Sequence, residues 1–167
     1  MAVTLRPQQP DDLPLLTGGA SPFDDFGPRA IRTTPSQPQF DTAGGLSVIA
    51  DDGEVAGDVG WHWEQWGPNP GSRCPMIGIW LRPTYRGRGI GSAAQALLVD
   101  LFFSHTTTNR VEAYTDVDNV LEQRALEAAG FQREGLIRGA QWRDGMYRDG
   151  FLYAILRGDP QPARSAG

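Results

Sequence analysis

The sequence predicts a mixed α/β fold of the α+β kind. A twisted, mostly antiparallel sheet of about six or seven strands would contain one parallel crossover and carry about four helices. Strand and helix patterns alternate only between residues 76 and 131, which gives the single crossover, and hairpin patterns flank this unit on both sides. The 167 residues suit one domain, expected over residues 1–157, with a flexible tail rich in proline, alanine and serine over residues 158–167.

Seven segments have the apolar pattern of strands. They are residues 3–6, 46–50, 55–64, 76–81, 111–115, 131–138 and 147–156. In the third segment, Val59 and Trp61 fall on one face, whereas Asp58, His62 and Glu64 fall on the other. That strand therefore presents an apolar face and a polar face.

The clearest helix is expected over residues 90–104, where apolar side chains recur at helical spacing. A second helix begins after Asp118 or Asn119, either of which can cap it, and Gly130 stops it. A short helix is also expected around residues 13–16.

Residues 17–45 are rich in glycine and proline, and we expect only one helical turn there, around residues 26–33. A structureless segment of this length is uncommon in a compact domain unless it is functional. Its aromatic residues Phe23, Phe26 and Phe40 indicate that it packs against the rest of the protein.

The residue types exclude several chemistries. All 15 basic residues are arginine, so there is neither a Schiff-base lysine nor the lysine of a nucleoside triphosphate P-loop. His62 and His105 are far apart and Cys74 is isolated, which argues against a zinc site, and no metal is expected.

Charge and hydropathy indicate the class of partner and the location. The net charge is -5, and an acidic protein repels phosphate backbones, so a positively charged amine is favoured over nucleic acid. No apolar run reaches the roughly 18 residues that span a bilayer, so no membrane association is expected. With a single cysteine and no secretion signal, a cytoplasmic location is expected.

The strongest local signal is the segment of glycines and arginines at residues 86–92, directly after a strand and directly before a helix. A helix N-terminus has free backbone N–H groups, and glycines let an anion approach them closely. Arg86 and Arg88 would add charge-assisted hydrogen bonds, so the segment predicts a phosphate or pyrophosphate site. A tight turn with a solvated basic loop is the alternative.

The spacing of this loop resembles a known family. Arg86, Gly89 and Gly91 match the Arg/Gln-x-x-Gly-x-Gly/Ala pyrophosphate motif of the GNAT superfamily of N-acetyltransferases. Residues 79–83 resemble that family's coenzyme-binding strand, and residues 119–131 resemble its Asn-x(10)-Gly-Phe helix.

Residues 133–135 and 142–149 are similar to the RimJ/RimL-like branch, which acetylates protein N-termini and small amines. The resemblance covers about residues 74–157. It implies a GNAT-like fold, acetyl-CoA as the co-substrate, and transfer of the acetyl group to the primary amine of a protein N-terminus or small molecule by direct attack in a ternary complex. A homodimer is common in that family.

The resemblance also implies which residues hold the coenzyme. Backbone groups of the strand would pair with the pantetheine arm, the glycine loop would hold the pyrophosphate, and the second helix would contribute an amide and an arginine. These residues are Trp80, Leu81, Arg82, Arg86, Gly87, Arg88, Gly89, Ile90, Gly91, Ser92, Asn119 and Arg124. For Asn119, a plain helix cap is an equal interpretation.

The usual acid and base of the family are missing. Many members have a tyrosine where this chain has Leu126, and many RimJ/RimL-like members have a glutamate near Met76. We take His62 and Glu64 as the candidate catalytic residues, against the alternatives of a partly buried strand residue and a solvated strand end. Less favoured candidates are Tyr114, Asp116 and Ser92.

Two other classes of protein stay open on the sequence. A non-catalytic acyl-CoA-binding module fits the missing tyrosine and glutamate. A nucleotide-binding protein of another fold fits the anion site. The acceptor also stays open among a protein N-terminus, an amino acid, a polyamine and an amine antibiotic.

Overall fold

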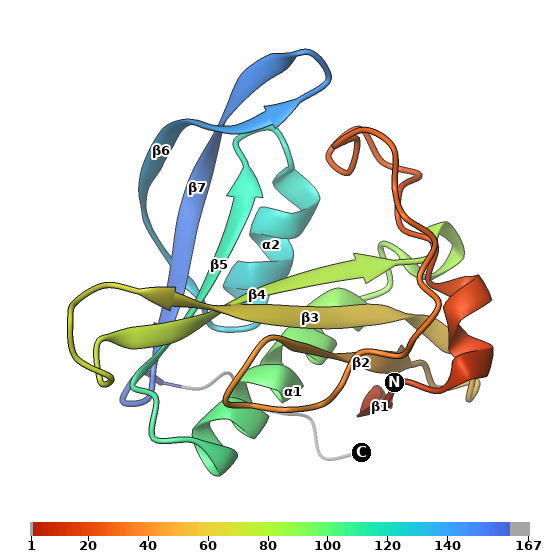
Figure 1. Ribbon diagram of the computed structural model, residues 1–167, viewed down its shortest axis with the longest axis horizontal. Helices are drawn as coiled ribbons and strands as arrows, with labels where there is room; N and C mark the ends of the chain where they lie inside the picture. Colours follow the sequence, from red (N-terminus) through yellow and green to blue (C-terminus); the bar gives the residue numbers. More distant parts are fainter. Residues whose placement is uncertain (1, 161–167) are drawn as a thin grey trace.

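One seven-stranded sheet organises the chain in the computed structural model, which describes residues 2–160 (Figure 1). The strands are β1 (Thr4–Pro7), β2 (Gly44–Ile49), β3 (Val55–Gln65), β4 (Arg73–Leu81), β5 (Arg110–Asp116), β6 (Gln132–Arg143) and β7 (Met146–Leu156). They lie in the order β1-β2-β3-β4-β5-β7-β6, and only β4 and β5 are parallel neighbours. The predicted mixed α/β fold with one parallel crossover is confirmed.

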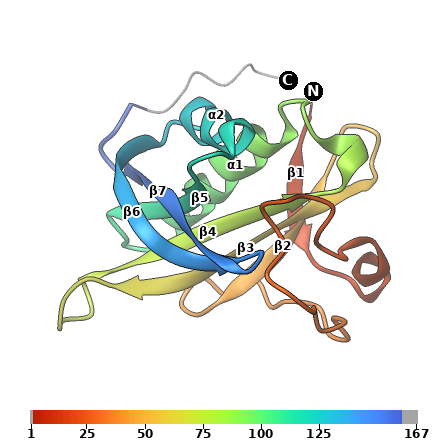
Figure 2. The same cartoon turned by 90° about the horizontal axis from the view of Figure 1, so that it is seen from above.

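Two α-helices cover one face of this sheet. They are α1 (Ile90–His105), which forms the crossover from β4 to β5, and α2 (Val120–Ala128). In Figure 2 both helices lie above the sheet, and part of the long irregular segment between β1 and β2 lies below it. The described residues also include two 3-10 helices, η1 (Pro10–Leu15) and η2 (Pro83–Tyr85).

The core lies between the sheet and α1. The apolar face predicted for β3 is buried there, because Val59 and Trp61 pack with Phe102 of α1, which is fully buried. The ring centroids of Trp61 and Phe102 are 5.3 Å apart in an edge-to-face arrangement. Full burial of each such side chain contributes about 1.5–3 kcal/mol to the free energy of folding. This packing holds the apolar face of β3 against α1 and leaves the polar face free for other contacts.

The irregular segment differs from the prediction in one respect. The helical turn expected around residues 26–33 is wrong, since these residues form no helix. Gly27 has φ +94° and is followed by Pro28, which together interrupt helical geometry. The aromatic prediction holds for Phe40, which stacks on Trp61 at 5.1 Å, but Phe26 is exposed. Of the expected tail, residues 161–167 lie outside the described residues.

The strands β4 and β5 separate in the middle of the sheet. Their ladder consists of Met76 opposite Glu112 and Ile77 opposite Ala113, after which the two strands point in clearly different directions (Figure 1). The edge of β4 from Gly78 to Leu81 therefore faces β5 without a ladder partner. The loop between β4 and α1, the start of α2 and the polar face of β3 lie around this opening.

Candidate functional site

The loop between β4 and α1 has the geometry of an anion site. Gly87 and Gly89 adopt φ +71° and +76°, which L side chains rarely tolerate, and Gly89 is the N-cap of α1. No side chain caps this helix, so the first N–H groups of its 16 residues point outward unpaired. A Cβ at Gly87 would meet nothing within 4 Å, so the space over the loop is open. The loop therefore has unpaired main-chain donors beside open space, and its binding of a phosphate or pyrophosphate stays a prediction.

Its two arginines have different surroundings. Arg86 donates from Nε to the Leu81 carbonyl at 2.8 Å and from Nη1 and Nη2 to the carbonyls of Ala20 and Gly19 at 2.7 and 3.2 Å. Arg88 lies over the ring of Tyr85 and only 45% of its side chain is exposed, with Asp51 at 3.6 Å. Arg86 is thus engaged by backbone carbonyls, whereas the guanidinium of Arg88 is held loosely beside the loop.

Two further loop residues shape the start of α1. Ile90 is fully buried and anchors the helix to the core. The hydroxyl of Ser92 donates to the Gly89 carbonyl at 3.0 Å. A Cβ at Gly91 would lie 3.7 Å from Leu81 and 4.0 Å from Ala125, so this glycine sits where α1, β4 and α2 converge.

The open edge of β4 offers a second set of main-chain groups. The N–H of Arg82 donates to the carbonyl of Ala56 on β3 at 2.8 Å. Because backbone groups alternate in direction along a strand, those of Trp80 also face β3, and those of Ile79 and Leu81 face the open edge. Of the three strand residues predicted to hold the coenzyme, Leu81 has the suitable direction, with its N–H toward the edge and its carbonyl already accepting from Arg86. Ile79 has the same direction.

The predicted residues of α2 lie at its start and on its surface. The side-chain oxygen of Asn119 accepts the N–H of Glu122 at 3.3 Å, so Asn119 is the helix cap. Arg124 is exposed, and its side chain makes no ion pair within residues 2–160. Their contacts with a coenzyme stay predictions.

Glu122 is a polar residue that the sequence analysis missed. It lies on the side of α2 that meets α1, where the amide of Gln95 donates to its carboxylate at 3.0 Å. Burial raises the pKa of Glu122 to about 7, and the charge of Asp24 adds to this, while the bond from Gln95 acts in the other direction. Leu126, one turn later, is fully buried. A charged residue four positions before a buried leucine on one helix face is the signal that could have identified it.

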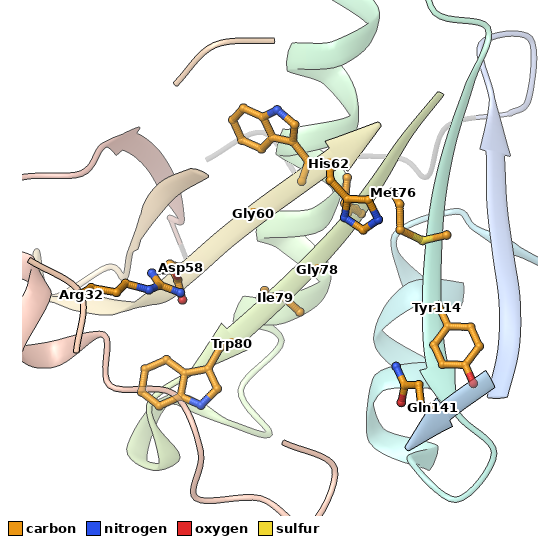
Figure 3. A pocket seen from close by; sticks show the side chains of 12 residues that line it. Arg32, Asp58, Gly60, His62, Met76, Gly78, Ile79, Trp80, Tyr114 and Gln141 are labelled. Atoms are coloured by element: carbon orange, nitrogen blue, oxygen red, sulfur yellow. Dashed lines mark hydrogen bonds and ion pairs between the residues drawn. The ribbon is translucent and has the colours of Figure 1, made fainter. Parts of the chain in front are cut away.

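On the face of the sheet opposite the helices lies a cavity of about 430 Å³ (Figure 3). Its lining residues come from β3, β4, β5, β6 and the irregular segment: Arg32, Asp58, Gly60, Trp61, His62, Met76, Ile77, Gly78, Ile79, Trp80, Tyr114 and Gln141. Gly60 and Gly78 are opposite each other in the ladder, and a Cβ at Gly78 would meet nothing within 4 Å. The two glycines therefore leave a shallow open floor between larger side chains.

One end of this cavity is lined by His62, and Glu64, the other predicted catalytic residue, lies beside it outside the lining. Nε2 of His62 is 2.8 Å from Oε1 of Glu64, and the side chains are 60% and 45% exposed. His62 lies opposite Met76 in the ladder, which is the neighbourhood where the RimJ/RimL-like resemblance places a glutamate. The structure thus brings His62 and Glu64 together as a hydrogen-bonded pair.

The other end holds a pair that the sequence did not predict as a site. Nη1 of Arg32 lies 2.5 Å from Oδ2 of Asp58, although 26 residues separate them. Asp58 is only 8% exposed, and burial raises its pKa while Arg32 opposes the shift. Arg32 and Asp58 share no sequence motif, so only their contact in the folded structure identifies them as a pair.

The less favoured candidates have other roles in the structure. Asp116 forms a buried ion pair with Arg143 and also accepts the N–H of Asp118. Tyr114 lies flat against Gly150, where a Cβ would be 2.0 Å from its ring. Burial raises the pKa of Tyr114. Both residues belong to β5, which together with β6 forms one wall of the cavity.

The family is shown by comparison of the whole sequence. Residues 3–132 match the family described as the acetyltransferase (GNAT) domain, and the chain belongs to that family. It is 35% identical over 86 residues to the probable N-acetyltransferase YjcK of Bacillus subtilis, covering 52% of this chain and 48% of that protein. It is 29% identical over 106 residues to the putative ribosomal N-acetyltransferase YdaF of the same species, covering 64% and 56%. The chain thus spans about half the length of these curated relatives.

Solved structures agree with the fold and with the predicted branch. RimJ of Mycobacterium smegmatis, in complex with CoA-disulfide, is 28% identical with a TM-score of 0.62 over 70% of this chain and 54% of that one. A chimera of the spermidine N-acetyltransferase SpeG from Vibrio cholerae is 20% identical with a TM-score of 0.70 over 92% and 95%. At that identity the second likeness shows the fold alone.

Among residues 2–160, no group of three or more histidine, cysteine or acidic side chains is placed to hold a metal ion. None of the helices described in the structure has the length and apolar character needed to cross a membrane.

Proposed function

We propose that this chain is an acetyl-CoA-dependent N-acetyltransferase that moves the acetyl group to a primary amine by direct attack in a ternary complex. The observation that carries the proposal is the opening between β4 and β5. An uncapped helix N-terminus and a free strand edge meet it from the helix side, and a cavity with a His–Glu pair adjoins the same strand on the opposite face. Two reactants could thus approach one point from opposite faces.

The main chain supplies most of the proposed coenzyme site. The N–H groups from Gly87 to Ser92 would bind the pyrophosphate, with Arg88 adding charge. The open edge at Ile79 and Leu81 would pair with the pantetheine arm, and Asn119 and Arg124 would contribute from α2. The bound coenzyme supplies an activated acyl carbon and a thiolate leaving group. A backbone N–H on the open edge of β4 would stabilise the negative charge that develops on the acyl oxygen.

His62 is the proposed general base. Glu64 would hold the proton on Nε2, leaving Nδ1 free to take the proton of the attacking amine, directly or through water, and would then stabilise the imidazolium. His62 lies on β3 two residues from Gly60, whose ladder partner Gly78 is the first residue of β4 beyond its pairing with β5. The base would therefore adjoin the point where the amine attacks.

Glu122 is the proposed donor that returns a proton to the coenzyme sulfur. Its raised pKa of about 7 keeps a substantial fraction protonated near neutral pH. It occupies the face of α2 one turn before Leu126, where many family members have a tyrosine. Solvent would restore the proton of Glu122 and remove that of His62, so the cycle balances.

The test combines binding and turnover. Calorimetry with acetyl-CoA, CoA and NAD should show binding of the first two only, and tight NAD binding would instead favour a nucleotide-binding protein. A thiol-release assay with a panel of amines should give turnover, since a non-catalytic acyl-CoA-binding module would bind acetyl-CoA without releasing thiol. The name of YdaF, a putative ribosomal N-acetyltransferase, and the resemblance to the RimJ/RimL-like branch support a protein N-terminus as acceptor, so the panel includes peptides as well as small amines. A homodimer and a cytoplasmic location remain predictions.

A further inference from the structure

The carboxylate of Asp58 is the fixed element at the end of the cavity away from His62. It is built into β3, opposite Trp80 in the ladder, and only 8% of the residue is exposed. A buried carboxylate without a cation is strongly destabilising, so this position requires a positive partner whenever it is charged. The site is thus constructed to hold a cation.

In the structure, the cation beside Asp58 is the guanidinium of Arg32, and the segment that carries Arg32 is held weakly by the rest of the protein. Arg32 belongs to a stretch, residues 25–34, in which every residue is exposed, and Ile31 beside it is 89% exposed. That stretch has no helix or strand, and the side chain of Arg32 is itself 45% exposed. An exposed segment tied down through a salt bridge exchanges its partner at low cost, because an incoming cation replaces the charge that leaves.

The position of Asp58 relative to the reaction point sets the distance between the reacting amine and a second positive charge on the acceptor. Asp58 and His62 are four residues apart on β3, which spans about 13 Å, with Gly60 midway. Gly60 lies opposite Gly78, where β4 loses its pairing with β5. An amine over this glycine floor would therefore have the His62–Glu64 pair about 6–7 Å to one side and Asp58 a similar distance to the other. The side chains of Trp80 and Met76 flank that floor and suit an aliphatic linker (Figure 3).

We propose that Asp58 is a cation subsite for the acceptor, and that Arg32 occupies it until an acceptor with a second positive charge displaces it. The preferred substrate class is then an aliphatic diamine or polyamine, with a few carbon atoms between the reacting nitrogen and the second ammonium group. The inference rests on the proposed N-acetyltransferase function and adds its specificity. An acceptor with a carboxylate in place of the second ammonium would instead need Arg32 and would be repelled by Asp58.

The test uses three acceptors of equal chain length: butane-1,4-diamine, butylamine and 4-aminobutyrate. For the natural sequence, kcat/KM for the diamine should exceed that for each of the other two by about tenfold or more. Asp58→Asn should reduce the ratio of diamine to butylamine to near one. Arg32→Gln should lower KM for the diamine severalfold, because it removes the competing cation. A preference for 4-aminobutyrate, or an unchanged diamine preference in Asp58→Asn, would overturn the inference.

Arg29→Gln is the matched control, since it removes the same charge from the same exposed stretch. The guanidinium of Arg29 binds the Asp24 carbonyl and acts on Asp58 only through its charge, so KM for the diamine should change much less than in Arg32→Gln. Calorimetric titration of butane-1,4-diamine into protein saturated with CoA measures the subsite without turnover. Binding that Asp58→Asn abolishes, in the absence of acetylation, would keep the subsite and reject the proposed function, whereas acetylation of butylamine with no diamine binding would do the opposite.

Discussion

The helix side and the cavity side of the opening between β4 and β5 differ in the groups that they offer to a ligand: backbone groups on the first and side chains on the second. On the helix side, most of the candidate coenzyme site is one continuous segment, from Ile79 to Ser92, whose donors are mostly backbone N–H groups, with Asn119 and Arg124 added from α2. On the other side, the candidate acceptor site consists of side chains from distant parts of the chain, such as Arg32, His62 and Gln141. Main-chain sites depend on conformation, whereas side-chain sites depend on the identity of each residue. Substitutions should therefore act on the two sides in different ways.

The largest effect is expected on the cavity side. His62→Ala should lower kcat by about a hundredfold or more, because loss of a general base removes that much acceleration. The calorimetric Kd for acetyl-CoA should change little, because His62 lies on the opposite face. Glu64→Gln should give a smaller loss of kcat. Unchanged kcat in both variants would remove the pair from the mechanism, and a large change in Kd would break the separation of the two sides.

The next effect concerns Glu122, the titratable side chain of the helix side. Its folded pKa of about 7 lies above the ordinary value of 4.5, so the folded state favours the protonated form. This contribution to stability is complete below pH 4.5 and is lost as the pH rises towards 7, at a cost of up to about 3 kcal/mol. Glu122→Gln should therefore raise Tm at pH 8 and leave it nearly unchanged at pH 4. An equal gain at both pH values would assign the effect to packing.

A conformational change at the coenzyme loop should follow in size. Gly89→Val places a branched side chain at φ +76°, which costs about 1–2 kcal/mol, and should weaken acetyl-CoA binding by about five- to thirtyfold. Gly145→Val is the matched control, since Gly145 has φ +72° in the β6–β7 hairpin. Both variants should lose stability in thermal melts, but calorimetry should show weaker binding only for Gly89→Val. Equal binding in both would contradict the assignment of the loop.

The smallest effect is expected from the arginines of that loop. Arg88→Gln should weaken acetyl-CoA binding about two- to fivefold at low salt, and the difference should shrink as salt screens the partly exposed charge. Arg86→Gln should instead lower Tm, because it removes three hydrogen bonds to backbone carbonyls. If Arg88→Gln lowered Tm and Arg86→Gln did not, the assignment of Arg88 to coenzyme binding and of Arg86 to structural stability would be wrong.

The sequence by itself determined the features that depend on neighbouring residues. The positive-φ glycines of the coenzyme loop, the cap at Asn119 and the two faces of β3 follow from local hydrogen bonding, local sterics and strand periodicity. The same patterns gave the crossover between β4 and β5, and with it the fold class.

Only the tertiary structure decided the rest. It placed Arg32 on Asp58 across 26 residues, and it bonded Arg86, a predicted phosphate ligand, to the carbonyls of Gly19 and Ala20. It set the half-buried Glu122 against Gln95. It also left residues 26–33 without the expected helix. The physical reason is that partners and pKa values depend on burial and on charges brought close by folding, and no local pattern encodes which distant side chain will arrive.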